Sequence, residues 1–365
     1  MGSLCHLEHL INRRISRLGQ ISSVQFQIPL AIPDGVKRMF RAFIIPQILR
    51  QTQTRQIIIQ NIRTAGTYIE KIKAENPDFV ILPEMFCCPY QTENFPVYAE
   101  KEGGPSWQAM SDYARKYHIY LIAGSMPEAD DVGKVYNTSY IFDRDGKQIG
   151  KHRKAHLFDI NVKNGQHFKE SDTLTSGDHA TVFDTEFGKM GVMICYDIRF
   201  PEFARTMVLD GARMIFVPAA FNMTTGPAHW ELTFRARALD NQIYMLGCAP
   251  ARDTQAGYIS WGHSIVTDSW GKVMKQLDEK EGILIEEIDL DREDQIREQL
   301  LKLLRLAACF GLHCGKRTLS LELRAGGHFR HAGLFFRIRH FSALPFLKVH
   351  QVHWEPVPGQ VQDPV

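Results

Sequence analysis

Apolar runs and amphipathic stretches alternate along the middle of the chain, and this pattern predicts strands that alternate with helices. In Asn61–Ala74 four apolar side chains recur at helical spacing, and Asn76 and Pro77 then end the helix. Other apolar runs are short, continuous and bounded by polar turns, which is typical of buried strands. The predicted helices are Asn61–Ala74, Pro105–Tyr117, Pro201–Asp210 and Trp230–Asn241, and the predicted strands are Phe79–Leu82, Ile119–Gly124, Gly191–Cys195, Met214–Pro218, Ile243–Cys248 and Gly282–Ile288.

Two β-hairpins interrupt the alternation. The first joins Val135–Phe142 to Lys147–Lys151 through a turn with glycine in its last position, and the second joins Ser264–Asp268 to Lys272–Leu277. Two successive passages of the chain therefore each carry a strand, a helix, a strand and a hairpin. This organisation predicts an α/β fold of mixed sheets with covering helices, arranged as a two-sheet sandwich with the helices outside. The rival arrangement is a single doubly wound sheet.

Charge divides the chain into three parts. The 365 residues carry a formal net charge of +2, but bases outnumber acids in residues 1–63 and in residues 301–365, whereas acids predominate between them. We therefore expect an atypical basic extension over residues 1–60, with the first strand near residues 41–48. A folded domain should occupy residues 61–300, and a basic, histidine-rich tail residues 301–365.

Composition argues against several classes of partner. Neither basic end carries a nucleic-acid-binding motif or four consecutive bases, so no nucleic acid is expected. No apolar run approaches the roughly 18 residues of a membrane span, so no membrane is expected. The seven cysteines are an odd number without repeated spacing, which favours a reducing compartment such as the cytoplasm. Residues 6–23 contain arginine and little acid, which also fits a mitochondrial transit peptide or an unstructured leader.

Three side chains with useful chemistry follow predicted strands, where the functional groups of such folds tend to lie. Glu84 follows "FVILP", Glu128 follows "LIAGSMP" and Cys195 ends "VMIC", while Lys154 lies in the basic stretch "GKHRKAHLFD". Each residue alone also has a structural interpretation. Glu84 could cap the next segment, Lys154 could be solvated, and Cys195 could pack as a small apolar side chain.

Together these residues fit nucleophilic catalysis. A free thiol is only slightly ionised at neutral pH, so Cys195 needs a base, and Glu84 could take its proton and later activate water. Lys154 and the backbone N–H of Tyr196 would stabilise the oxyanion of a tetrahedral intermediate. Glu128 would keep Lys154 charged and oriented. This scheme needs no histidine, metal or cofactor.

The segments "LPEMF", "HRKAHLFD" and "CYDIRFPE", in this order and at these separations, resemble the Glu-Lys-Cys motifs of the nitrilase superfamily. The resemblance covers roughly residues 61–300. It implies an α-β-β-α sandwich in which Glu84 is the base, Lys154 stabilises the transition state and Cys195 is the nucleophile. Glu128 matches a second glutamate that supports the lysine. The implied activity is that of an amidohydrolase acting on linear amide C–N bonds.

Two further segments, "FNMTTGPAHWELTFRARALDNQIY" and "YISWGHS", look like the omega-amidase branch of this superfamily. Members of that branch hydrolyse the terminal amide of 2-oxoglutaramate and 2-oxosuccinamate to ammonia and a 2-oxo diacid. The resemblance therefore implies a small dicarboxylate monoamide as substrate. Tyr196 and Asp197 stand where a nitrilase more often has Trp and Glu, which weighs against nitriles. The alternatives are a superfamily amidase for carbamoyl or short aliphatic amides, and an inactive or misfolded member.

A dicarboxylate monoamide also needs a cation for its free carboxylate. Arg199 lies four residues after Cys195, and a bidentate contact with the carboxylate would orient the amide carbon toward the sulfur. The alternative for Arg199 is a structural salt bridge with Asp197 or Glu202. Three further residues are expected to line the pocket: Tyr90, Phe221 and Thr225.

The remaining histidines and cysteines carry weaker signals. His152 and His156 have the spacing of two metal ligands on a helix, but no third ligand or HExxH pattern accompanies them, so no metal site is expected. His229 and His263 are expected to be structural or to form the pocket wall. Three cysteines are expected to serve packing alone: Cys87, Cys88 and Cys248.

The two ends of the chain depart from the family pattern. The family begins with a core strand shortly before the first helix, and the nearest candidate here, Arg41–Ile48, contains Pro46, which disfavours a central strand. Without that strand an exposed sheet edge would hinder folding or dimerisation. The resemblance implies a homodimer, but other residues replace the family's interface segment after "REQL". Residues 301–365 therefore fit either a partner-binding tail or an aberrant translation product.

Overall fold

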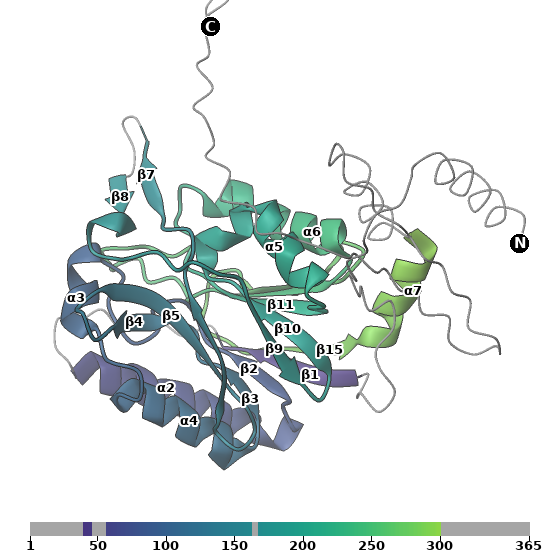
Figure 1. Cartoon of the computed structure of the whole chain (residues 1–365), viewed down its shortest axis with the longest axis horizontal. Helices are drawn as coiled ribbons and strands as arrows, with labels where there is room; N and C mark the ends of the chain where they lie inside the picture. The colour runs from purple at the N-terminus through teal and green to yellow at the C-terminus, as the bar shows by residue number, and fades with distance from the viewer. Residues whose placement is uncertain (1–38, 46–55, 163–166, 301–365) are drawn as a thin grey trace, which may run out of the picture. The chain divides into compact units, whose positions relative to one another are not determined.

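The structure is a computed structural model, and it describes residues 39–45, 56–162 and 167–300 (Figure 1). All of these residues belong to one compact unit. The predictions of a leader over residues 6–23 and of a histidine-rich tail over residues 301–365 lie outside the described residues. No helix in the described ranges is long and apolar enough to cross a membrane.

The first of two large sheets has seven strands. They run in the order β15-β1-β2-β3-β5-β4, and β6 pairs with β5. The strand β1 lies inside this sheet, parallel to β2 and antiparallel to β15. The bounds are β1 Met39–Ile44, β2 Phe79–Ile81, β3 Tyr120–Ile122, β4 Met126–Ala129, β5 Val135–Phe142, β6 Gln148–Arg153 and β15 Leu284–Asp289.

The second sheet has six strands in the order β14-β13-β12-β11-β10-β9, and a separate hairpin pairs β7 with β8. In this sheet β10, β11 and β12 are parallel, whereas the flanking strands are antiparallel to their neighbours. The bounds are β7 Asp159–Asn161, β8 His167–Lys169, β9 Thr181–Thr185, β10 Gly188–Val192, β11 Met214–Pro218, β12 Tyr244–Cys248, β13 Ile265–Thr267 and β14 Val273–Gln276.

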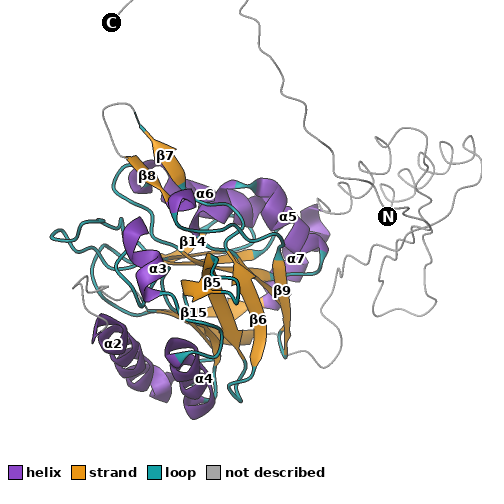
Figure 2. Ribbon diagram, turned by 60° about the vertical axis from the view of Figure 1, so that its left-hand side comes forward, coloured by secondary structure: helices purple, strands orange, loops and turns teal. Residues whose placement is uncertain are grey.

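Helices cover the outer face of each sheet, as both views show (Figures 1 and 2). The helices α2 and α4 lie on the first sheet, and α5 and α6 lie on the second. The bounds are α2 Gln56–Ile72, α3 Phe95–Tyr98, α4 Pro105–Tyr117, α5 Pro201–Leu209, α6 Gly226–Asn241 and α7 Leu290–Leu300, with short 3-10 helices at η1 Lys73–Glu75, η2 Thr92–Asn94, η3 Glu170–Asp172 and η4 Cys195–Arg199.

Alternating side chains of the buried strands divide the core into layers. In β2, Phe79 and Ile81 pack between the sheets, whereas Val80 packs under the helices of the first sheet. In β11, Phe216 packs between the sheets and Ile215 faces the other way, toward α5 and α6. Strands that are apolar on both faces therefore suit a four-layer α-β-β-α sandwich. This confirms the predicted fold class and excludes the single doubly wound sheet.

The predicted strand bounds differ from the structure most clearly at β1 and β10. The first strand is present, but it occupies Met39–Ile44 and ends before Pro46, so the proline does not interrupt the sheet. The strand predicted over Gly191–Cys195 ends at Val192 instead, and Cys195 begins the 3-10 helix η4. The pattern also does not predict α7, because most of its residues are charged or polar.

Candidate active site

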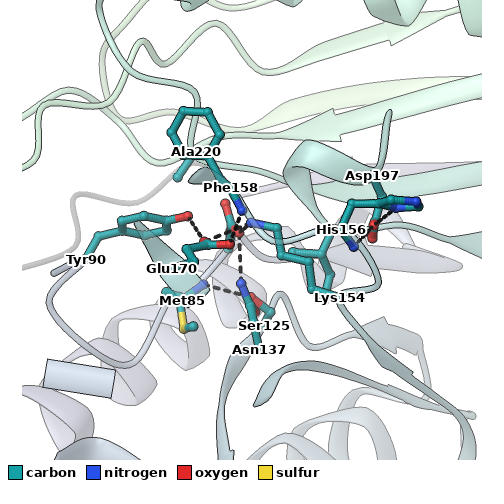
Figure 3. A network of polar contacts seen from close by, with 12 residues as sticks. Met85, Tyr90, Ser125, Asn137, Lys154, His156, Phe158, Glu170, Asp197 and Ala220 are labelled. Atoms are coloured by element: carbon teal, nitrogen blue, oxygen red, sulfur yellow. Dashed lines mark hydrogen bonds and ion pairs between the residues drawn. The ribbon is translucent and has the colours of Figure 1, made fainter. Parts of the chain in front are cut away.

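Lys154 lies between two carboxylates in the interior of the molecule (Figure 3). Its Nζ is 2.9 Å from Glu84 Oε1 and 2.9 Å from Glu170 Oε1, and all three side chains are fully buried. Glu84 comes from the loop after β2, Lys154 directly follows β6, and Glu170 begins η3. An ammonium has three N–H donors, so one donor of Lys154 remains after these two contacts.

The carboxylates keep Lys154 charged. Burial alone would lower the pKa of this ammonium, but Glu170 and Glu84 raise it well above its usual range. Burial raises the pKa of Glu170, and the charge of Lys154 only partly opposes that change. The site therefore holds a permanent cation that can stabilise negative charge on a substrate atom.

Close packing between two loops places Glu84. The N–H of Met85 donates to Ser125 Oγ at 2.9 Å, and the N–H of Ser125 donates to the carbonyl of Pro83 at 3.2 Å. Gly124, at φ +54°, allows this approach, because a Cβ there would lie 2.2 Å from the Pro83 carbonyl oxygen. Glu84 is thus fixed from both sides along the chain.

Only one oxygen of Glu84 is engaged. Oε1 accepts from Lys154 and also from Asn137 Nδ2, at 2.9 Å each. Oε2 is buried and accepts no hydrogen bond from the described residues. Asn137 belongs to β5, and its carbonyl accepts from the N–H of Lys154 at 2.8 Å. An unpaired carboxylate oxygen in a buried site is suited to take a proton.

Cys195 lies beside this network in a strained conformation. Its side chain is 5% exposed, and its φ is +46°, which a residue other than glycine rarely adopts. Burial and the charge of Glu84 raise the pKa of the thiol, while Lys154 and a backbone hydrogen bond from Ala220 lower it. Burial dominates, so the pKa of the resting thiol stays above its usual value. An attack by the sulfur therefore needs a base.

Glu128 does not support Lys154, which corrects the sequence-based expectation. Its carboxylate accepts from Arg153 at 2.8 and 3.0 Å and pairs with Lys151. Lys151 and Arg153 share one face of β6, and Glu128 lies on that face. Lys154 is the next residue, so it is one position out of step with them. Glu170, and not Glu128, is the second carboxylate that pairs with Lys154. None of the segments quoted in the sequence analysis contains Glu170.

Arg199 has neither of the salt bridges that the sequence allowed. It donates to His229 Nδ1 at 2.8 Å, and its guanidinium lies over the rings of Tyr196 and Phe221, 5.4 and 5.0 Å from their centroids. Its Nε is buried without a partner among the described residues. Desolvation and the charge of Arg199 lower the pKa of His229, so this histidine is a neutral acceptor. The cation remains available for an anion.

The three residues expected to line the pocket have different surroundings. Tyr90 donates to Glu170 Oε1 at 2.9 Å, and with Ala220 and Tyr258 it lines a small cavity. Phe221 packs edge-on against Trp230. The N–H and the hydroxyl of Thr225, in contrast, both donate to Asn222 Oδ1, at the turn that opens α6. The backbone N–H of Tyr196 as an oxyanion donor stays a prediction.

The two histidines with metal-ligand spacing bind a carboxylate instead. His152 Nε2 lies 3.0 Å from Asp197 Oδ2, and His156 Nδ1 lies 2.8 Å from Asp197 Oδ1. Within the described ranges, no group of His, Cys, Asp and Glu is arranged to hold a metal ion. His263 stacks on Trp261 with the ring centroids 4.2 Å apart. The predicted packing cysteines are buried and not bonded to one another: Cys87, Cys88 and Cys248.

Comparisons with known proteins show which group of proteins this chain is similar to. The family model described as Carbon-nitrogen hydrolase matches residues 49–298. The Mus musculus protein "Omega-amidase NIT2" is 47% identical over 252 residues, which are 69% of this chain and 91% of that protein. The Xenopus laevis protein "Omega-amidase NIT2-A" is 49% identical over 240 residues, or 66% and 87% of the two chains.

A solved structure shows the same fold. The crystal structure of Saccharomyces cerevisiae Nit3, described as a member of branch 10 of the nitrilase superfamily, superposes with a TM-score of 0.67. It is 39% identical, and the match covers 74% of this chain and 97% of that chain. Sequence and structural comparisons therefore point to the same group of proteins.

Proposed function

The chain belongs to the carbon-nitrogen hydrolase family, and from this premise we propose that it is an omega-amidase that hydrolyses 2-oxoglutaramate through a thioester on Cys195. The observation that carries the proposal is the buried Lys154 between Glu84 and Glu170, beside a cysteine that needs a base. The similar proteins named omega-amidase support the substrate class.

The first half of the proposed reaction forms the thioester. Glu84 Oε2 takes the thiol proton of Cys195, and the sulfur attacks the terminal amide carbon. The C=O electron pair moves to oxygen, where the free N–H of Lys154 and the backbone N–H of Tyr196 stabilise the negative charge. Glu84 then gives the proton to the amide nitrogen, the C–N bond breaks, and ammonia leaves.

The second half releases the diacid. A water molecule gives a proton to Glu84 and attacks the thioester carbon, again with Lys154 at the oxyanion. The C–S bond breaks as the carbonyl re-forms, and Glu84 returns its proton to the sulfur of Cys195. Amide and water thus become carboxylic acid and ammonia, and the side chains return to their initial states.

Arg199 would hold the carboxylate at the far end of the substrate. Its guanidinium has no carboxylate partner among the described residues, and it lies in the segment that begins with Cys195. The two aromatic faces and His229 restrict its orientation. A fixed guanidinium would select amides that carry a second, anionic end.

The proposed function is tested by ammonia release from 2-oxoglutaramate and from pentanamide, which has the same chain length and no charge. We expect 2-oxoglutaramate to be hydrolysed with the higher kcat/KM. In Arg199→Met, kcat/KM for 2-oxoglutaramate should fall about 100-fold, mainly through KM, because a charged hydrogen-bonded pair is lost. The rate with pentanamide should stay within about threefold.

Arg235→Met is a matched control, because Arg235 is a half-exposed residue of α6 that pairs with Glu231. Its kinetics should equal those of the unsubstituted chain. Preference for pentanamide by the unsubstituted chain would refute the omega-amidase assignment. An equal loss on both substrates in Arg199→Met would refute the role of Arg199 in carboxylate binding.

The roles of the two glutamates are separated by paired substitutions. Glu170→Gln is expected to lower kcat for 2-oxoglutaramate about 10- to 100-fold, because Lys154 loses one of the charges that hold and orient it. Glu128→Gln should change kcat less than about threefold, because the carboxylate of Glu128 is bonded to Thr138 and Arg153 and not to Lys154. Steady-state rates of ammonia release measure both. The reverse ranking would restore Glu128 as the supporting residue.

A further inference from the structure

Three polar residues next to the proposed catalytic groups have no part in the reaction described above. Asp197 lies two residues after Cys195, and His152 and His156 lie two residues before and after Lys154. Asp197 is fully buried. Burial of a carboxylate costs free energy unless its oxygens are paired, so the partners of Asp197 are of interest.

Four donors converge on the carboxylate of Asp197. Oδ2 accepts from the backbone N–H of Ile194 and from His152 Nε2, both at 3.0 Å. Oδ1 accepts from the backbone N–H of His156 at 2.9 Å and from its Nδ1 at 2.8 Å. In the view of Figure 3, Asp197 and His156 lie on the opposite side of Lys154 from Tyr90 and Glu170.

These contacts join the two segments that carry the nucleophile and the lysine. The bond to Ile194 spans Cys195 and holds the turn in which φ of Cys195 is +46°. The bonds to His152 and His156 hold the chain on both sides of Lys154. We propose that Asp197 is a positioning residue that sets the Cys195 sulfur against the Lys154 ammonium; this role rests on the proposed amidase function.

Packing around the histidines makes the connection rigid. The ring of His156 stacks on Phe200 with the centroids 3.6 Å apart and meets Phe203 edge-on. His152 Nδ1 lies 3.1 Å from Thr181 Oγ1, in β9. Burial alone would raise the pKa of Asp197, but the hydrogen bonds from the two histidines lower it well below its usual range. Asp197 is therefore ionised whenever the site is folded near neutral pH.

Asp197→Asn tests the proposal because the amide keeps the shape but places an NH2 group against N–H donors. We expect kcat for 2-oxoglutaramate to fall about 10- to 100-fold with KM changed less than about threefold, since small displacements of reacting groups have effects of this size. A second readout is independent of the substrate. Iodoacetamide alkylates the ionised sulfur of Cys195, and peptide mass spectrometry measures the rate of this alkylation at each pH. In Asp197→Asn the midpoint of the rate against pH should move to higher pH, because the sulfur loses the nearby cation.

His156→Phe is a milder variant for the case that Asp197→Asn does not fold. It keeps a ring that stacks on Phe200 and removes one side-chain donor, so kcat should fall about three- to tenfold with a smaller shift of the alkylation midpoint. His179→Phe is the matched control, because His179 is exposed and forms its ion pair with the neighbouring Asp178. It should leave both measurements unchanged.

The outcomes separate the two proposals. A shifted alkylation midpoint in the folded Asp197→Asn or His156→Phe variant supports the positioning role, even where 2-oxoglutaramate is not the substrate. A purely structural role would lower the melting temperature but leave the midpoint and the kcat of the folded fraction unchanged, and that result would overturn the proposal. Failure of the unsubstituted chain on 2-oxoglutaramate would reject the omega-amidase function alone.

Discussion

Cys195→Ala is expected to abolish ammonia release from 2-oxoglutaramate, with a loss in kcat/KM of at least about 10⁴-fold. The substitution removes the only atom that forms the proposed covalent bond, so no other side chain of the site can take over the step. Removal of this one buried sulfur should cost about 1 kcal/mol of unfolding free energy and leave the fold intact. The loss is measured by steady-state ammonia release, with the melting temperature recorded for the same preparation.

Cys248→Ala is the matched control for this substitution. Cys248 is buried in the core between the sheets, where its sulfur lies 3.6 Å from the carbonyl oxygen of Ile45, and it has no part in the proposed reaction. It should cost about 1 kcal/mol of unfolding free energy and leave kcat unchanged. Activity retained in Cys195→Ala would exclude the thioester pathway.

Glu84→Gln is expected to lower kcat/KM at least about 10³-fold, because the base is lost while the geometry is kept. The amide oxygen of Gln can still accept from Lys154 and Asn137, as Glu84 Oε1 does. The NH2 group then replaces Oε2, which is buried and accepts no hydrogen bond from the described residues. An NH2 group cannot accept the thiol proton or the proton of water, so both halves of the reaction should slow.

Single-turnover experiments with Glu84→Gln distinguish this interpretation from a loss of binding. We expect the rate of thioester formation to fall while KM for 2-oxoglutaramate changes less than about threefold. A drop in kcat/KM of less than about tenfold would show that another group, with Glu170 as the nearest candidate, serves as the base.

The elements that the sequence predicted correctly are those whose bounds depend on residues close together in the chain. Pro105 occupies the first turn of α4, where its missing N–H costs nothing, and the predicted bounds Pro105–Tyr117 match the structure. The strand Met214–Pro218 was equally readable, since it is apolar on both faces. Glu84, Lys154 and Cys195 belong to short motifs, so each could be proposed from its own segment, and their catalytic roles stay predictions.

Contacts between distant segments could not be predicted in this way. Glu170 reaches Lys154, Asn137 reaches Glu84 across 53 residues, and Asp197 reaches His156 across 41 residues. Such partners depend on strand register and parity, and a shift by one residue moves a side chain to the other face of the sheet. That is why Glu128, which the sequence places after a strand but which lies within β4, is on the wrong face to support Lys154.

The sequence by itself therefore determined the alternation of helices and strands, and the resemblance of its motifs pointed to the four-layer fold and to the nucleophile, base and lysine of the proposed reaction. Only the tertiary structure decided which carboxylate accompanies Lys154, which oxygen of Glu84 is free, and that β1 closes the gap between β2 and β15. The physical reason is that the preferences of residues close together in the chain decide whether a segment forms a helix or a strand. Strand pairing and burial then decide which other segments it contacts.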